Sequence, residues 1–153
     1  MNNKDAVVEV KSKSITQKEI QNIEYQDFGL SKDSKEALNN WQKYQELSNQ
    51  IDYLKTADLS FFKSEKTELQ TFLNDFKTEI PRTIATNEIS ARILVLETKV
   101  LKLNSLLTLD NIKKSDQLKG INEVLIAMSN LNLQINKKFE FDANNISKST
   151  IDQ

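Results

Sequence analysis

The sequence contains neither cysteine nor histidine. The chain therefore has no thiolate and no imidazole, which excludes disulfides, cysteine or histidine catalysis and the commonest zinc sites. Only two glycines are present, and they form no glycine-rich phosphate loop. We expect a protein that is not an enzyme and that has no catalytic residues, no metal site and no bound cofactor.

Carboxylates are the chemical groups that remain. Asp75 and Glu79 are four residues apart on the solvent side of an amphipathic segment, which is typical of a solvated surface. The stretch 110–115 resembles a calcium-binding loop, but Ser115 stands where such a loop needs glycine and Ile121 where it needs glutamate. Neither arrangement predicts a catalytic or metal-binding site.

Basic patches and long apolar runs are also lacking. The formal net charge is −1, and the lysine pairs 113–114 and 137–138 are isolated among acidic residues. No basic stripe is available for a phosphate backbone, so we expect no nucleic-acid partner. No run is long and apolar enough to span a membrane, and residues 1–15 lack the apolar centre of a signal peptide.

A single proline and two glycines leave few turn residues and few helix breakers, which indicates an all-α protein. Helical patterns cover about 17–27, 34–56, 64–79, 86–108 and 115–140. Thr16 and Glu19 fit a capping box before the first helix, and Gly29 can end that helix in the left-handed conformation. Gly120 within the last helix indicates close packing.

The most regular apolar pattern lies between Pro81 and Leu109. Six residues recur there at spacings of three and four, on one side of a helix, and Leu94, Val95, Leu101 and Leu106 widen the apolar face. The six are Ile89, Ile93, Leu96, Val100, Leu103 and Leu107. We expect this to be the most buried helix of the domain.

Four main helices with short connections predict an antiparallel up-down-up-down four-helix bundle, preceded by a short N-terminal helix. The alternative is a long three-helix bundle in which residues 34–79 form a single kinked rod. The expected organisation is a flexible leader or tether remnant over 1–15, a single helical domain over 16–141 and a disordered polar tail over 142–153.

Two features have both a structural and a functional interpretation. Four aromatic residues, Trp41, Tyr44, Phe61 and Phe62, belong to the core in the structural interpretation and form a partner-binding patch in the functional one. Asn132 interrupts the apolar series of the last helix. We expect Asn132 to face solvent through a local register slip; if buried, it would fix the pairing register of the helices.

Five stretches, at 23–31, 41–62, 72–81, 91–107 and 129–140, give the chain its resemblance to small uncharacterised helical lipoproteins of flavobacteria and related Bacteroidetes. The first reads IEYQDFGLS and the fourth ARILVLETKVLKLNSLL. The resemblance spans about Ile20 to Glu140 and lends no site residues. It implies export and an N-terminal lipidated cysteine that tethers the domain to an envelope membrane. This sequence has no cysteine, so the resemblance implies that the signal and anchor have been removed.

The function expected from these observations is a non-enzymatic interaction or scaffold domain of a bacterial cell-envelope lipoprotein, with an unidentified protein partner. Its membrane contact would be made only through the removed lipid anchor. The first alternative is a self-associating structural bundle whose central heptads form a homo-oligomer interface. The second is a membrane-active protein, although the charges of Arg92, Glu97, Lys99 and Lys102 oppose insertion of the central helix.

Overall fold

The computed structural model describes residues 14–151, and this part of the chain is built from helices without a strand, which confirms the all-α class. Two short 3₁₀ turns interrupt the order of the α-helices. The elements in chain order are α2 (Gln17–Gln21), α3 (Lys32–Ala37), α4 (Gln42–Lys55), η1 (Phe61–Lys63), α5 (Lys66–Thr78), η2 (Arg82–Ile84), α6 (Asn87–Thr108) and α7 (Lys114–Ile151).

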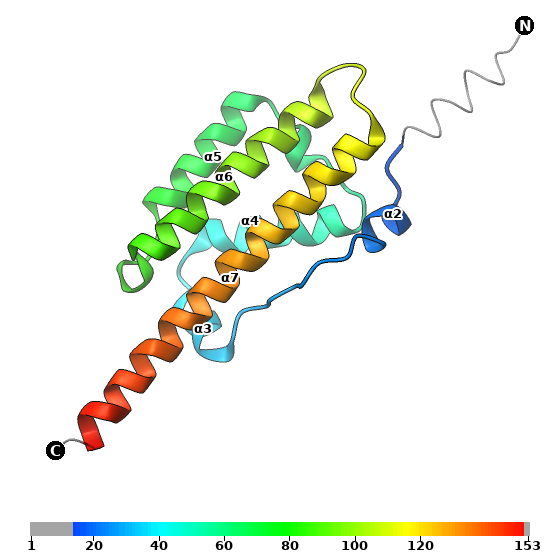
Figure 1. The fold of residues 1–153 in the computed structure, drawn as a ribbon. Coiled ribbons are helices and arrows are strands. Elements are labelled where there is room, and N and C mark those ends of the chain that lie inside the picture. The colour runs from blue at the N-terminus through cyan, green and yellow to red at the C-terminus, as the bar shows by residue number, and fades with distance from the viewer. Residues whose placement is uncertain (1–13, 152–153) are drawn as a thin grey trace, which may run out of the picture.

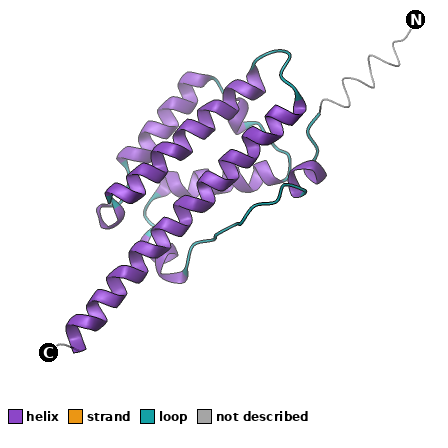
Figure 2. Cartoon of the chain, in the orientation of Figure 1, coloured by secondary structure: helices purple, strands orange, loops and turns teal. Residues whose placement is uncertain are grey.

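Helices α5, α6 and α7 run side by side, with α6 between the other two (Figure 1). Helix α4 packs against α5, and the short α2 packs against both α4 and α7. Between α2 and α3 the chain forms an extended segment, residues 22–31, which we call the strap. Figure 2 shows the strap as a loop that passes alongside α7 on its way to α3.

The regular stripe of α6 is buried in the core as predicted, although α7 contributes a larger number of buried side chains. Ile89, Leu96 and Val100 are each at most 1% exposed, Ile93 and Leu103 are also buried, and Leu107 is partly buried against the same core. The apolar face is narrower than predicted, because Leu94 is 59% and Val95 44% exposed, whereas Leu101 is partly buried against the core. Helices α5 and α7 flank α6 and, together with η1, cover its regular stripe but leave Leu94 and Val95 exposed. The apolar residues on its other side have no described neighbour to cover them.

The expected helix over 34–56 is divided at Asn39 and Asn40 into α3 and α4. Asparagine favours turns because its short amide competes with helical hydrogen bonds. At this break the Trp41 indole donates to the carbonyl of Phe76 at 3.1 Å, which attaches the start of α4 to α5. Ser31 is the N-cap of α3, and its side chain accepts a hydrogen bond from the Ser34 N–H.

Helices α4 and α5 are separate, so residues 34–79 do not form the kinked rod of the three-helix alternative. Ala57 has a φ of 69°, which reverses the chain directly after α4. The buried amide of Asn104 on α6 then donates to the carbonyls of Phe62 and Ser64 at 2.9 and 2.8 Å. These bonds attach the η1 turn to the centre of the molecule.

The first described helix is shorter than expected. The capping box of Thr16 and Glu19 is present, but α2 ends at Gln21 instead of about residue 27. Gly29 does not take the left-handed conformation, since it lies in the extended strap and no glycine has a positive φ. The strap is stabilised by contacts with α7, which the local sequence does not reveal.

Helix α7 continues to Ile151 and therefore includes residues of the polar tail that the sequence predicts from residue 142. No glycine or proline follows Gly120, and nothing in the sequence stops the helix. The close packing predicted at Gly120 is confirmed: a Cβ atom there would lie 2.6 Å from Cδ1 of Leu106. Except for residues 14 and 15, the expected leader lies outside the described residues, as do residues 152–153 of the tail.

Candidate functional site

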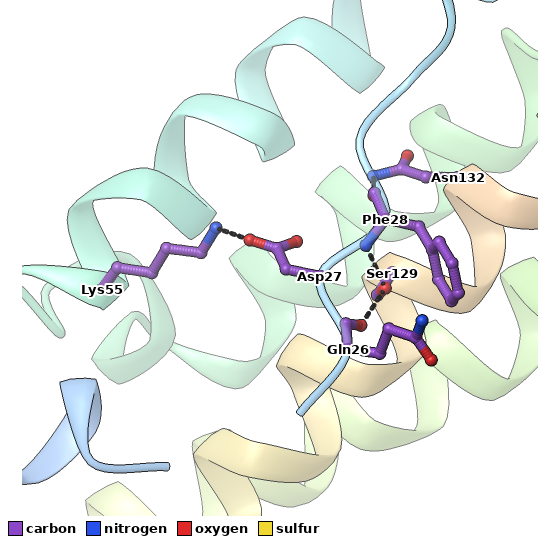
Figure 3. A network of polar contacts seen from close by, with 6 residues as sticks. All are labelled: Gln26, Asp27, Phe28, Lys55, Ser129 and Asn132. Atoms are coloured by element: carbon purple, nitrogen blue, oxygen red, sulfur yellow. Dashed lines mark hydrogen bonds and ion pairs between the residues drawn. The ribbon is translucent and has the colours of Figure 1, made fainter. Parts of the chain in front are cut away.

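The strap is held against α7 by side chains that bind its main chain. Ser129 Oγ accepts a hydrogen bond from the Phe28 N–H at 2.7 Å and donates to the Gln26 carbonyl at 2.6 Å. One turn further along α7, the Asn132 amide donates to the Phe28 carbonyl at 3.0 Å. Figure 3 shows how Ser129 and Asn132 face the strap. Because both side chains bond to the strap only through its backbone, they hold an extended chain without selecting its side chains.

Asn136 completes this row on α7. Its amide nitrogen donates to the Gly29 carbonyl at 2.9 Å, and its Oδ1 accepts from the Ser31 N–H at 2.9 Å. The same oxygen accepts from the Ser34 hydroxyl at 2.9 Å, and Ser34 is fully buried. Ser129, Asn132 and Asn136 therefore form a polar row with spacings of three and four, on one face of α7. We call these three residues the α7 row.

Tyr44 on α4 donates a hydrogen bond from its hydroxyl to Oδ1 of Asn132. Asn132 is 9% exposed, so the expectation that it faces solvent is wrong. Its oxygen contacts α4 while its nitrogen contacts the strap, and a buried amide needs partners at both ends. Asn132 thus aligns three segments, which agrees with the register role considered for a buried residue here. The Tyr44 hydroxyl is a protonated donor at neutral pH, and burial raises its pKa further above the ordinary value.

An ion pair closes the other side of the strap. Lys55 Nζ on α4 lies 2.9 Å from a carboxylate oxygen of Asp27, and both side chains keep considerable solvent exposure (Figure 3). Burial tends to lower the pKa of Lys55, but the hydrogen bond to Asp27 and the nearby Tyr25 raise it overall. Burial also raises the pKa of the Tyr25 hydroxyl. The strap is thus connected to α7 by its backbone and to α4 by a charged side chain.

A cavity of about 520 Å³ lies between the strap, α3, α4 and α7. Its apolar wall includes Ile51 of α4 and Leu125 and Met128 of α7. Gln45, Ser48 and Asp52, with spacings of three and four along α4, provide polar groups at the cavity; we call them the α4 row. Ser129 and Asn132 of the α7 row also line this cavity, opposite the α4 row, and we call the space between them the α4–α7 groove.

The cavity lining contains two lysines, Lys35 and Lys55, and two aspartates, Asp27 and Asp52. Their formal charges cancel, so the lining does not favour an anion or a cation. Amide and hydroxyl groups supply most of its remaining polar atoms, and these groups both donate and accept hydrogen bonds. A neutral polar ligand with alternating donors and acceptors, such as a peptide backbone, matches this lining.

The four predicted aromatic residues are not gathered in an exposed patch. Trp41, Tyr44 and Phe62 are buried, and Phe61 is partly buried against the core. Trp41 and Tyr44 form one cluster with Phe76, whereas Phe61 and Phe62 form another with Phe72. Their positions agree with the structural interpretation, in which these residues belong to the core. Of the four, only Tyr44 lines the groove.

Sequence reasoning missed Ser129, Asn136 and the α4 row. The available signal was the spacing of Ser129, Asn132 and Asn136, which places three short polar side chains on one face of a long helix. Only Asn132 interrupts the predicted apolar series. A polar row is usually read as a solvated face, and the strap that covers this one is remote in sequence.

No group of three carboxylate side chains with metal-binding geometry is found among the described residues. In the same part of the chain, none of the helices combines the length and apolarity that crossing a membrane requires. Comparison of the chain with family models, curated proteins and solved structures found no match.

Proposed function

We propose that this chain is a non-enzymatic helical interaction domain of a bacterial cell-envelope lipoprotein, and that it binds an extended peptide of a partner protein in the α4–α7 groove. The observation that carries the proposal is the strap: an extended segment already lies in this groove and is held there through its main chain. A second extended segment would use the same physical mode of recognition, in which backbone hydrogen bonds provide affinity.

The open half of the groove supports this proposal. The strap occupies the side of the groove that faces the α7 row, while the cavity is bordered by the α4 row. In an extended chain, alternate residues direct their backbone groups to opposite sides. Gln26 and Phe28 direct backbone groups toward α7, and no hydrogen bond of the intervening Asp27 backbone is found among the described residues. The alternation ends at Gly29, whose carbonyl also bonds to α7. A peptide between the strap and α4 would have the Asp27 backbone on one side and the α4 row of Gln45, Ser48 and Asp52 on the other.

The chemistry of the groove supports a binding role rather than a catalytic one. The Ser129 hydroxyl is hydrogen-bonded to two backbone groups, and burial raises the pKa of Tyr44 still further above neutral pH. A serine nucleophile needs an adjacent general base, and none of the hydrogen bonds of Ser129 is made to such a group. These side chains hold segments in place.

The cell-envelope assignment rests on the resemblance to flavobacterial lipoproteins. We further propose that α4, α5, α6 and α7 act as the antiparallel four-helix bundle predicted from the sequence, with contacts α4–α5, α5–α6 and α6–α7 in its support. Metabolic labelling of the protein expressed from its full reading frame, with a palmitate analogue, tests the envelope assignment. Absence of label, together with recovery in the cytoplasmic fraction, would contradict it.

Photo-crosslinking tests the binding role. The crosslinking amino acid p-benzoylphenylalanine would replace Ser48, which borders the cavity, in the full-length protein inside its native cells. The matched control carries the crosslinking amino acid in place of Glu68, which is exposed on α5. We expect a discrete adduct from position 48 alone, whose mass spectrum identifies a peptide of the partner.

A groove-filling variant makes the experiment specific. Gln45→Trp would place an indole in the cavity and should abolish the adduct at position 48 while circular dichroism shows an intact fold. An adduct that persists in this variant, or equal adducts at positions 48 and 68, would overturn peptide binding in the groove.

Self-association is the second candidate function, and the exposure of Leu94 and Val95 on α6 favours it. The stripe of central heptads is buried within the monomer, which speaks against this stripe as the interface. The exposed side of the same helix is the surface that remains for a second copy.

A further inference from the structure

The exposed side of α6 carries a second regular stripe. Its members recur at spacings of three, four, three and four, so they share one face of the helix. They are all exposed and are, in order, Glu88, Ala91, Val95, Thr98 and Lys102. Leu94, 59% exposed, lies beside Val95 and widens the apolar centre. Helix α6 therefore has one regular stripe that is buried in the domain and a second regular stripe that is exposed on its outer face.

The charges at the ends of this stripe are opposite and equidistant from its centre. Glu88 and Lys102 each lie seven residues from Val95, which is about 10 Å along the axis. In an antiparallel pair of α6 helices centred on Val95, Glu88 of each copy would lie opposite Lys102 of the other. Val95 would meet its own counterpart, flanked by the small side chains Ala91 and Thr98. The stripe is thus complementary to itself in one orientation.

We propose that the outer face of α6 is an isologous dimer interface whose occupant is a second copy of this chain. The inference rests on the proposed interaction function and names a partner for a surface separate from the α4–α7 groove. In a two-fold symmetric contact the same patch serves both copies, so every charge pair occurs twice. The symmetric placement of opposite charges around an exposed apolar centre is what such a contact requires.

Lys102 is free to take part because Glu123 on α7 keeps another partner. Glu123 Oε2 lies 3.0 Å from Lys102 Nζ and 3.6 Å from Lys99 Nζ. When Lys102 turns to the second copy, Lys99 still neutralises Glu123. The Lys102 side chain is 49% exposed, so the rearrangement needs no change in the core. The apolar centre is small, and the dimer is expected to be weak and concentration-dependent.

Sedimentation velocity across a range of protein concentrations tests the interface. We expect the wild-type chain to approach twice the monomer mass at high concentration. Val95→Asp should remain monomeric, and Glu88→Lys or Lys102→Glu alone should weaken the dimer roughly tenfold, because each places two pairs of like charges opposite each other. Circular dichroism confirms that each variant is folded.

Exchange of the charges at positions 88 and 102 provides the most specific test of the interface. The double variant Glu88→Lys/Lys102→Glu restores both pairs within one chain and should dimerise as the wild type does. An equimolar mixture of the two single variants should form a heterodimer, since all its charge pairs are opposite. Glu68→Lys on α5 is the matched control and should dimerise unchanged.

A wild-type chain that stays monomeric at the highest concentration overturns the dimer. So does a dimer that is insensitive to Val95→Asp, or one that the double charge exchange fails to restore. None of these outcomes affects crosslinking at position 48, because Ser48 lies on α4 in the separate groove. The two proposals can therefore fail independently.

Discussion

The hydroxyl of Tyr44 on α4 donates to the side-chain oxygen of Asn132 on α7, although 88 residues separate them in the chain. Through its nitrogen, Asn132 also binds the backbone of the strap. The two bonds connect α4, α7 and the strap at the α4–α7 groove. A single amide therefore fixes how three segments remote in sequence are aligned.

Substitutions of Tyr44 and Asn132 should lower the free energy of unfolding by different amounts. Tyr44→Phe removes one donor and should lower the free energy of unfolding by about 1 kcal/mol. Asn132→Leu leaves both the Tyr44 hydroxyl and the Phe28 carbonyl without this partner, and should cost about 2–4 kcal/mol. Urea denaturation measures both, with the exposed Asn144→Ala as a neutral control. Equal costs for the two variants would contradict the double role of Asn132.

Two valines on α6 form a matched pair for testing the core. Val100 is fully buried, whereas Val95 is 44% exposed. Val100→Asp would bury an unpaired carboxylate and should lower stability by about 3 kcal/mol or more, while Val95→Asp should change it by less than about 1 kcal/mol. Thermal denaturation at low protein concentration separates the effects. A similar shift in both variants would mean that the buried side of α6 has been misidentified.

The sequence was sufficient to predict the buried stripe of α6 because helical periodicity depends only on neighbours three and four residues away. Residues 89, 93, 96, 100 and 103 follow this period and are buried. Leu94 and Val95 are equally apolar, but whether an apolar side chain is covered depends on the helices that pack nearby. Composition alone could not show that α5 and α7 leave this side of α6 open.

The groove could not be predicted for a related reason. The strap is extended because Ser129, Asn132 and Asn136 satisfy its backbone, and these residues lie about one hundred positions further along the chain. The sequence showed an unexpected Asn132 without showing its partners. Local signals worked where the interaction was local, as in the capping box of Thr16 and Glu19.

Gly120 allows α7 to approach α6, and the effect of its substitution on stability should depend on Leu106. A Cβ atom at position 120 would lie 2.6 Å from Cδ1 of Leu106 and 3.3 Å from Cδ1 of Leu103. Gly120→Ala should therefore gain little or lose stability, although alanine favours a helix by about 1 kcal/mol over glycine. In a Leu106→Ala background, the same substitution should stabilise the protein by about that amount. Thermal denaturation of the four proteins tests this change, and identical effects in both backgrounds would contradict the contact.

Acid should weaken the attachment of α2 through Glu19. The backbone N–H of Thr16 and the ammonium group of Lys114 on α7 both stabilise the Glu19 carboxylate and lower its pKa. A carboxyl group whose pKa is lower in the folded state stabilises the fold above its unfolded pKa, and this contribution is lost as the pH falls through the folded pKa. Glu19→Gln should consequently lose less stability than the wild type between neutral pH and about pH 3. Urea midpoints measured across this range provide the comparison, and parallel pH profiles would contradict a role for Glu19.

Removal of the α7 row should release the strap without unfolding the helices. Ser129→Ala leaves the Phe28 N–H and the Gln26 carbonyl without their described partner, and Asn136→Ala does the same for the Ser31 N–H and the Gly29 carbonyl. Amide hydrogen exchange at Phe28 and Ser31 should therefore accelerate by roughly tenfold or more, since each bond contributes about 1 kcal/mol or more to local closure.

Exchange in the centre of α6 should remain slow in these variants, because the α6 stripe packs in the core and makes no bond to the strap. Asn130→Ala, on the same helix but outside the α7 row, is the matched control and should leave exchange in the strap unchanged. Acceleration throughout α6 would instead indicate global destabilisation. If exchange stays slow at both Phe28 and Ser31, the side chains of α7 are not what holds the strap in the groove.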